Sequence, residues 1–227
     1  MGQYHLNFWS LYVDYLEAFK PLKYKGVSLP LLSTFHLYLD DACRARIARP
    51  DSGRWLRTQL RGESDIQPGV NRYLPAGLGG DGLSKPRIAD KPRPGKLLLH
   101  TSLLFLPDSM LQAYFSPSDT MVVVGKPPKS NLFMNGLPTY SVSSFERLPK
   151  PIIRPIMTCA KQLLNEHSRH PIFGNSVFQQ HFLADMERFV GYVLAIVQLF
   201  NRYQISAILL GTTNDALSRL LAIVGSM

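Results

Sequence analysis

The stretch Ser206–Val224 constrains the fold of this chain more than any other part of its sequence. It reads Ser-Ala-Ile-Leu-Leu-Gly-Thr-Thr-Asn-Asp-Ala-Leu-Ser-Arg-Leu-Leu-Ala-Ile-Val. Ala207–Leu210 form a continuous apolar run, which is the pattern of a parallel strand covered on both faces. Gly211 permits a sharp turn, and apolar residues then recur at helical spacing as far as Val224. We therefore predict a buried strand, a tight polar turn and a helix.

The predicted turn holds four consecutive polar residues, Thr212, Thr213, Asn214 and Asp215. Thr and Asn are common helix N-caps, and a carboxylate near the start of a helix is stabilised by the helix dipole. A polar loop at the carboxyl end of a strand is also where open α/β sheets bind ligands. Two interpretations stay open for these residues: a plain helix cap and a binding site.

The second half of the chain predicts alternating strands and helices. Its predicted elements before the final strand are Leu97–His100, Thr120–Val124, Leu137–Val142, Ile152–His167 and Ser176–Tyr203. Within this set, 137–142 is expected at the edge of the sheet, because Pro138 cannot donate to a central ladder. The order predicts an α/β fold, a Rossmann-like and mostly parallel sheet flanked by helices over residues 96–227.

The first 61 residues predict an all-helical region instead. One helix is expected over Asn7–Lys20 with Asn7 as its N-cap, and a second from Leu29 to about Ala48, capped by Ser28. A short third helix is expected around Trp55. Residues 62–95 are rich in Gly and Pro and lack hydrophobic periodicity, so we predict a long loop or linker there.

Two groups of side chains in this N-terminal part carry alternative interpretations. The aromatic residues are Tyr4, Phe8, Trp9, Tyr12, Tyr15, Phe19 and Tyr24, and the arginines are Arg44, Arg46, Arg49, Arg54, Arg57 and Arg61. The aromatic residues either pack against the rest of the protein or lie at a membrane interface. The arginines form either a solvated helix face or a patch for phosphates, although they lack the aromatic and glycine pattern of RNA-binding modules.

The net charge of +9 raises the question of an anionic partner. Nucleic acid, an anionic membrane surface and a phosphorylated small molecule are the candidates, beside a basic surface with no specific partner. Cys43 and Cys159 have no metal-ligand spacing and fit a reduced, cytoplasmic compartment. The longest nearly apolar run, Phe189–Phe200, is shorter than the roughly 20 residues that span a bilayer.

Residues at the ends of the predicted strands are the remaining site candidates. His100 ends one strand beside Thr101 and Ser102, and Lys126 follows another, where it could approach a phosphate or simply lie in a surface turn. One hypothesis places His100 and Asp215 in one pocket of a small α/β enzyme. No established catalytic motif occurs, so the sequence assigns no catalytic residue, and it predicts no metal site.

Residues 209–222, Leu-Leu-Gly-Thr-Thr-Asn-Asp-Ala-Leu-Ser-Arg-Leu-Leu-Ala, resemble part of the N-terminal half of bacterial GT-B glycosyltransferases of capsule and cell-envelope polysaccharide synthesis. Such proteins carry a strand ending in Gly-Asn/Thr-Thr-Asn-Asp and then a helix, and they continue through Gly-Ile-Pro and a Gln-His-Gly loop. The resemblance is sharp over these residues, extends to the order of elements over 96–203, and does not involve residues 1–95.

The resemblance implies an acceptor-side domain that is inactive without its second, donor-binding domain. Thr212–Asp215 would line the cleft between the two domains, with Thr101, Ser102 and Lys126 as further substrate-binding candidates. No cofactor is expected in this chain, since the nucleotide-sugar donor would bind mainly to the second domain. A sugar or anionic glycan acceptor and the inner face of the membrane are the implied partners.

The rival hypothesis from another functional class is a non-catalytic basic module. It would bind an anionic membrane surface or, less favoured, nucleic acid through the six arginines between Arg44 and Arg61.

Overall fold

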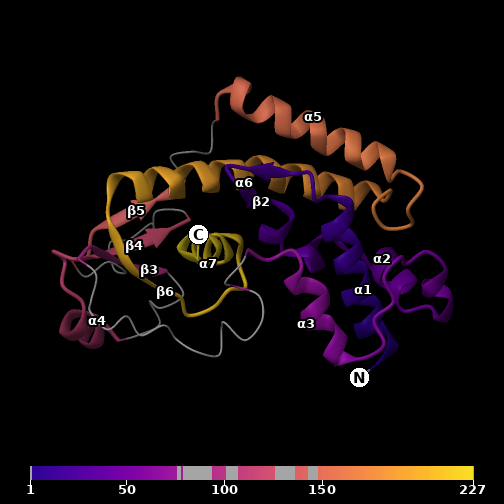
Figure 1. Cartoon of the computed structure of the whole chain (residues 1–227), viewed down its shortest axis with the longest axis horizontal. Helices are drawn as coiled ribbons and strands as arrows, with labels where there is room; N and C mark the ends of the chain where they lie inside the picture. Colours follow the sequence, from indigo (N-terminus) through magenta and orange to yellow (C-terminus); the bar gives the residue numbers. More distant parts are fainter. Residues whose placement is uncertain are drawn as a thin grey trace.

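A four-stranded parallel sheet forms the centre of the second half of the molecule (Figure 1). The computed structural model describes residues 2–75, 78, 94–100, 107–125, 136–142 and 148–226. The strands are β3 (Lys96–His100), β4 (Thr120–Val124), β5 (Thr139–Ser141) and β6 (Ile205–Leu209). Their spatial order is β5-β4-β3-β6, and all neighbouring pairs are parallel. The predicted Rossmann-like α/β fold is thus confirmed, with 139–141 at an edge as Pro138 indicated.

The two faces of this sheet pack against different side chains. Leu98, Met121 and Val123 belong to the main hydrophobic core, which they share with the long helices. Leu99 and Val122 lie on the opposite face in a smaller apolar cluster. Every residue of β4 is buried, so β4 matches the continuous apolar pattern that predicted it.

The last strand differs from its prediction. β6 lies at the other edge of the sheet, where Ala207 and Leu209 are exposed while Ile208 packs on the core side. A strand at the edge of a sheet, with one face open to solvent, does not need the apolar run that a central strand needs. The apolar run therefore predicted more burial of β6 than the structure shows. The prediction that Ala207–Leu210 are covered on both faces is wrong.

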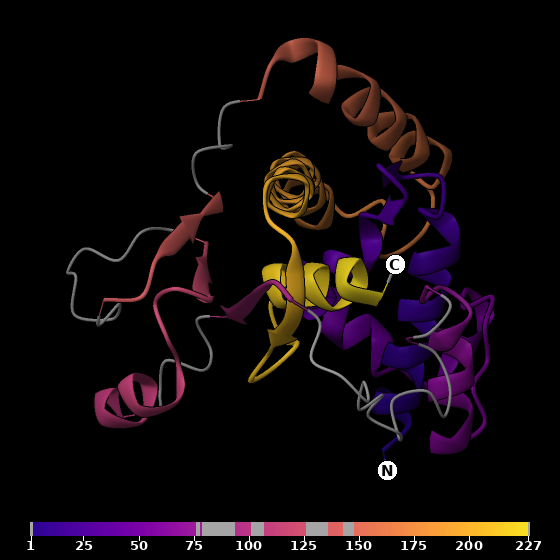
Figure 2. The same cartoon turned by 60° about the vertical axis from the view of Figure 1, so that its left-hand side comes forward.

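Four helices accompany the sheet: α4 (Asp108–Tyr114), α5 (Lys150–Glu166), α6 (Ser176–Arg202) and α7 (Ala216–Ser226). Asn175 caps α6, because its side-chain oxygen accepts hydrogen bonds from the main-chain N–H groups of Val177 and Phe178. Figure 1 shows α6 running along the sheet with α5 outside it. In Figure 2, α7 lies between the sheet and the N-terminal helices.

The N-terminal region, defined here as residues 2–75, begins with α1 (Gln3–Ala18). This helix starts before the predicted Asn7 cap, and Asn7 is instead buried. Its amide donates to the main-chain oxygen of Ile47 at 2.9 Å and to Ser52 Oγ at 2.7 Å. Asn7 therefore connects α1 to two residues that lie 40 and 45 positions further along the chain.

A short hairpin and broken helical turns replace the single helix predicted from Leu29 to Ala48. The observed elements are β1 (Lys23–Tyr24), β2 (Val27–Ser28), the 3₁₀ helices η1 (Pro30–Leu32) and η2 (Phe35–Tyr38), and the helix α2 (Asp41–Ile47). Lys25 and Gly26 both have positive φ, which is the conformation of a tight hairpin turn. Asp40 caps α2 by accepting from the main-chain N–H of Cys43 at 2.7 Å, so the chain starts a new helix there.

The end of the N-terminal region contains η3 (Pro50–Arg54) and α3 (Glu63–Asn71). Trp55 follows η3 in a turn, so the short third helix predicted around it is wrong. Helix α3 falls within the stretch predicted as a loop, and Gly69 on α3 packs closely against Val13 of α1. Because Gly69 has no Cβ, α3 can approach α1 closely. The weak hydrophobic periodicity of this stretch gave no sign of a helix.

Aromatic side chains join the N-terminal region to α6. Tyr15 lies 4.7 Å from Phe35 and about 6 Å from both Phe178 and Phe182, measured between ring centroids. These rings belong to one core cluster that also includes residues of β3, β4 and α7. The central part of the aromatic stripe therefore packs inside the protein rather than at a membrane interface.

Candidate functional site at the carboxyl edge of the sheet

The strand order reverses between β3 and β6. From β3 the chain moves outward to β4 and β5, and it then returns through α5 and α6 to place β6 on the other side of β3. In open α/β sheets, ligands bind beyond the carboxyl ends of the two strands that flank such a reversal. Those ends are His100 on β3 and the loop after Leu209 on β6.

His100 is enclosed at this position. It is only 3% exposed, and burial lowers the pKa of its imidazole, although the nearby Asp215 carboxylate acts in the opposite direction. The distance from His100 Nε2 to Asp215 Oδ1 is 3.6 Å. The structure therefore brings together the two residues that the sequence placed in one hypothetical pocket.

Asp215 is the N-cap of α7. Its Oδ1 accepts hydrogen bonds from the main-chain N–H groups of Leu217 and Ser218, both at 2.9 Å, and its Oδ2 accepts from Ser218 Oγ at 3.0 Å. These three bonds take up most of the acceptor capacity of the carboxylate. The cap interpretation is thus confirmed for Asp215, whose remaining capacity faces His100 and solvent, since half of the side chain is exposed.

The preceding residues of the loop are more accessible. Thr213 and Asn214 are exposed, and neither side chain forms a hydrogen bond with another described residue. Thr212 is half-buried, and its Oγ1 accepts from the main-chain N–H of Asn214 at 3.2 Å. Thr213 and Asn214 therefore present a free hydroxyl and a free carboxamide at the edge where a ligand is expected.

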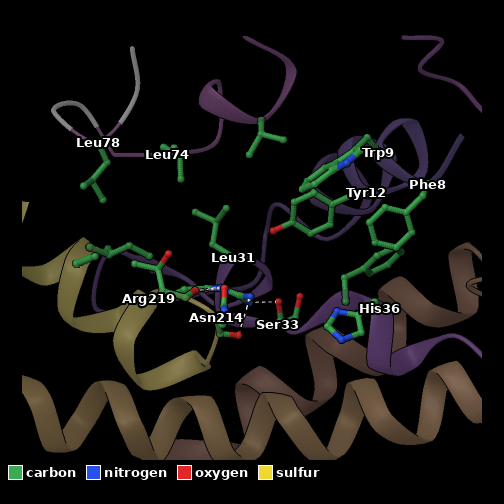
Figure 3. A pocket seen from close by; sticks show the side chains of 15 residues that line it. Phe8, Trp9, Tyr12, Leu31, Ser33, His36, Leu74, Leu78, Asn214 and Arg219 are labelled. Carbon is green, nitrogen blue, oxygen red and sulfur yellow. Dashed lines mark hydrogen bonds between the residues drawn. The ribbon is translucent and has the colours of Figure 1, made fainter. Parts of the chain in front are cut away.

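These two residues also line a pocket between the loop, α7 and the N-terminal region. The pocket has a volume of about 500 Å³. Its lining residues are Phe8, Trp9, Tyr12, Leu31, Ser33, Phe35, His36, Val70, Leu74, Leu78, Thr213, Asn214, Arg219, Ala222 and Ile223. Figure 3 shows Phe8, Trp9 and Tyr12 together on one side, with Leu74 and Leu78 at another and Asn214 beside Arg219. This volume falls within the range of small-molecule sites.

Arg219 holds the loop and the N-terminal region together. Its Nε donates to the main-chain oxygen of Thr213 at 2.9 Å, and one Nη donates to that of Asn214 at 3.0 Å. The other Nη donates to the main-chain oxygens of Leu32 and Ser33 (Figure 3). Among the described residues no carboxylate lies within 4 Å of this guanidinium, so its positive charge remains uncompensated.

The remaining predicted site residues have separate outcomes. Thr101, Ser102 and Lys126 lie outside the described residues. The six arginines between Arg44 and Arg61 are all exposed, and none of them forms an ion pair with another described residue. They extend over α2, η3 and the segment after η3 rather than along one helix face. The free cysteines are Cys43, which is buried, and Cys159, which is half-buried.

His170, in the connection between α5 and α6, has a structural role. Its Nδ1 accepts from the main-chain N–H groups of Ile172 and Phe173, both at 3.2 Å, and its ring stacks on Phe173. Over the described part of the chain there is no group of three His, Cys, Asp or Glu residues that could hold a metal ion. Within the same residues no helix is long and apolar enough to cross a membrane.

Sequence reasoning missed the aromatic wall of the pocket as a functional feature. From the sequence, Phe8, Trp9 and Tyr12 are predicted only to be part of a stripe that packs or meets a membrane. In the structure Tyr15 and Phe19 are fully buried, whereas Trp9 and Tyr12 are not. The sequence did contain a signal for this wall. An α-helix with aromatic residues over such a wide arc has more apolar surface than a single packing partner covers. What faces them, the end of α7, follows only from the tertiary structure.

Comparisons of the chain with protein-family models, with curated proteins and with solved structures find no match. The fold and the site define the class of protein: an α/β protein with a four-stranded parallel sheet and a polar loop at the point where its strand order reverses.

Proposed function

We propose that this chain is the acceptor-binding part of a glycosyltransferase-like protein of bacterial surface polysaccharide synthesis, and that it transfers no sugar without a donor-binding domain. The observation that carries the proposal is the position of the loop Thr212–Asp215, directly after β6 at the reversal of strand order. This is the stretch whose sequence resembles GT-B glycosyltransferases.

The chemistry of the loop supports a ligand with hydroxyl groups. Thr213 and Asn214 offer one hydroxyl and one carboxamide, which can both donate and accept hydrogen bonds. Asp215 is fixed by its capping bonds, and the His100 imidazole lies beside it. Because His100 is almost fully enclosed, we assign it the role of positioning Asp215, whereas the exposed residues make the contacts with the acceptor.

Binding to an array of bacterial surface oligosaccharides and polysaccharides tests this proposal. The labelled protein should bind a subset of glycans, and Asn214→Ala should weaken that binding by about tenfold, the loss expected for one or two hydrogen bonds. Asn201→Ala is the matched control, because Asn201 is an exposed asparagine at the end of α6 and does not line the pocket. Binding of no glycan, or equal binding by the two variants, would contradict the proposal.

The exposed arginines support a second candidate function, docking on an anionic membrane surface. Six exposed positive side chains lie between Arg44 and Arg61, and none forms an ion pair with another described residue. Each attracts anionic headgroups by about 1 kcal/mol near the surface. Flotation with anionic vesicles should recover the protein, and flotation with neutral vesicles should not. Replacing Arg44, Arg46, Arg49 and Arg54 with Gln should abolish recovery. Strong, salt-sensitive binding to nucleic acid of any sequence, without flotation, would favour a nucleic-acid module instead.

A further inference from the structure

The pocket beside the loop has a lining that is poorly suited to a sugar ring. Three of its polar side chains are already engaged: Ser33 Oγ donates to the Pro30 oxygen, Trp9 Nε1 donates to His5 Nε2, and Arg219 donates to four main-chain oxygens. Most other lining residues are aromatic or aliphatic. A polyhydroxylated ligand inside this pocket would lose hydrogen bonds to water without replacing them.

Of the polar side chains that remain, Thr213 and Asn214 lie at one end of the pocket, whereas His36 lies apart from Asn214, on the side of Phe8 (Figure 3). The main-chain oxygens of Thr213 and Asn214 accept hydrogen bonds from Arg219, while Leu74 and Leu78 form an apolar end (Figure 3). Tyr12 belongs to the aromatic wall and points its hydroxyl toward the side where Arg219 lies (Figure 3); this hydroxyl forms no hydrogen bond with another described residue. The pocket thus has a polar end and an apolar body, which is the arrangement that an amphiphile requires.

The charge of the lining selects the kind of head group. Among the described residues that line the pocket there is no Asp or Glu, and the one permanent charge is the Arg219 guanidinium, which has no carboxylate partner within this part of the chain. A cationic head would be repelled, and an anionic head would be attracted. Hydrogen bonds to main-chain oxygens satisfy N–H donors of the guanidinium but do not neutralise its positive charge.

Two exposed apolar side chains neighbour lining residues, one along the chain and one through a ring contact. Leu37, next to His36, is 61% exposed, and Tyr4, whose ring stacks on Phe8 at 6.5 Å, is 41% exposed. Large apolar side chains exposed to this extent can contact the hydrocarbon region of a membrane or a ligand that moves from the membrane to the protein. The surface around the pocket is therefore compatible with a ligand supplied from a membrane.

We propose that this pocket binds the hydrocarbon chain of an anionic amphiphile, with the head group at Thr213, Asn214 and Arg219. The inference deepens the proposed function, because an amphiphile held there would present its head at the loop that binds the acceptor. The inference rests on the proposed function in one respect: it treats that amphiphile as the acceptor. The binding of the chain itself is measured without any glycan.

The two tryptophans of the chain provide the measurement. Trp9 lines the pocket and Trp55 does not, so Trp55→Phe leaves Trp9 as the only fluorescent tryptophan. The probe is 11-bromoundecanoate below its micelle-forming concentration, because bromine quenches tryptophan only when the two are nearly in contact. We expect saturable quenching of Trp9, relieved by unbrominated undecanoate, and at least tenfold weaker competition by undecyltrimethylammonium.

Two pocket variants and one control complete the test in the Trp55→Phe background. Ala222→Phe fills the pocket from α7, and Leu74→Asp places a carboxylate in its apolar end. Each variant should bind 11-bromoundecanoate at least tenfold more weakly. Ala45→Phe, at an exposed alanine of α2, should leave binding unchanged. If one pocket variant fails to fold by circular dichroism, the other, on a different segment, still decides the result.

The outcomes separate this inference from the proposed function. Absence of saturable quenching, equal quenching in folded pocket variants, or equal competition by the cationic amphiphile would overturn the inference, even if the glycan array is positive. Saturable quenching that both pocket variants weaken would support it, even if the array shows no glycan, in which case the acceptor assignment fails alone.

Discussion

Tyr15 is the centre of the aromatic cluster and carries a hydroxyl with no hydrogen-bond partner among the described residues. The side chain is fully buried, and burial raises its pKa well above the ordinary value. A buried hydroxyl without a partner costs stability, so Tyr15→Phe should raise the free energy of unfolding by about 1 kcal/mol. Chemical denaturation measures this change.

Tyr38 in the same cluster is the matched control. Its hydroxyl donates to Asp185 Oδ2 at 2.7 Å, so Tyr38→Phe removes a bond to a charged group. We expect that variant to lose about 1.5–3 kcal/mol of stability. A loss of stability in Tyr15→Phe comparable to that in Tyr38→Phe would mean that the Tyr15 hydroxyl has a partner in solution.

His170 should make the protein less stable in mild acid. Burial, with smaller effects from His167 and Arg57, lowers its pKa from 6.5 to about 4. Between these two pH values the unfolded chain binds a proton that the folded chain does not, so stability is complete above pH 6.5 and falls as the pH decreases toward 4. Because the side chain is partly exposed, we expect a loss of about 1–2 kcal/mol.

His170→Asn isolates this effect, because an Asn side chain keeps an acceptor for the Ile172 and Phe173 N–H groups but does not titrate. Other groups titrate in both proteins, so the quantity to measure is the difference between wild type and variant as a function of pH. The stability of the wild type relative to the variant should decrease as the pH falls, because only the wild type has the titrating side chain at this position. A difference that stays constant between pH 6.5 and 4 would show that His170 is already protonated or already exposed.

At the scale of elements, the connection between α5 and α6 depends on a glycine. A Cβ on Gly174 would lie 2.1 Å from the main-chain oxygen of Ser168, which cannot move without breaking the turn that His170 supports. Gly174→Ala should therefore lower the unfolding free energy by about 2–4 kcal/mol. In Gly53→Ala the nearest atom is the flexible end of Gln59 at 3.8 Å, so thermal unfolding of that control should change little.

The sequence predicted the elements whose signal is local. The limits of β4 are those predicted, and α5 and α6 agree closely, because their periodicity and the Asn175 cap are written in consecutive residues. The sequence failed where distant partners decide the structure. Asp40, which starts a new helix inside Leu29–Ala48, also accepts a hydrogen bond at 3.2 Å from the side chain of Asn175, 135 residues away. Asn7 is no helix cap, because its amide donates to the main-chain oxygen of Ile47 and to Ser52 Oγ.

The candidate site shows the same limit at the scale of the whole molecule. The loop Thr212–Asp215 was predictable, since strand, turn and helix are contiguous, and so was the position of His100 at a strand end. The strand order that makes this edge the reversal point, and the pocket between Trp9 and Ala222, depend on contacts between residues far apart in sequence. Hydrophobic periodicity does not specify which faces meet.

The whole molecule should unfold as one unit, although its sequence suggests a helical region at 1–61 and an α/β domain at 96–227. One core cluster includes Tyr15, Phe178 and Leu220, and Arg219 joins the two parts through main-chain oxygens at both ends. Both tryptophans lie in the N-terminal region, whereas circular dichroism also follows α5, α6 and α7. The two signals should therefore change at one denaturant midpoint.

Arg219→Met extends this test. Losing the guanidinium leaves up to four main-chain oxygens without their donor, at an expected cost of about 2–4 kcal/mol. If the two parts are one cooperative unit, the midpoints from fluorescence and circular dichroism should fall together by the same amount. Arg154→Met, on the exposed surface of α5, should leave both unchanged. Separate midpoints in the wild type, or a shift in only one signal, would show that the N-terminal region and the sheet fold independently.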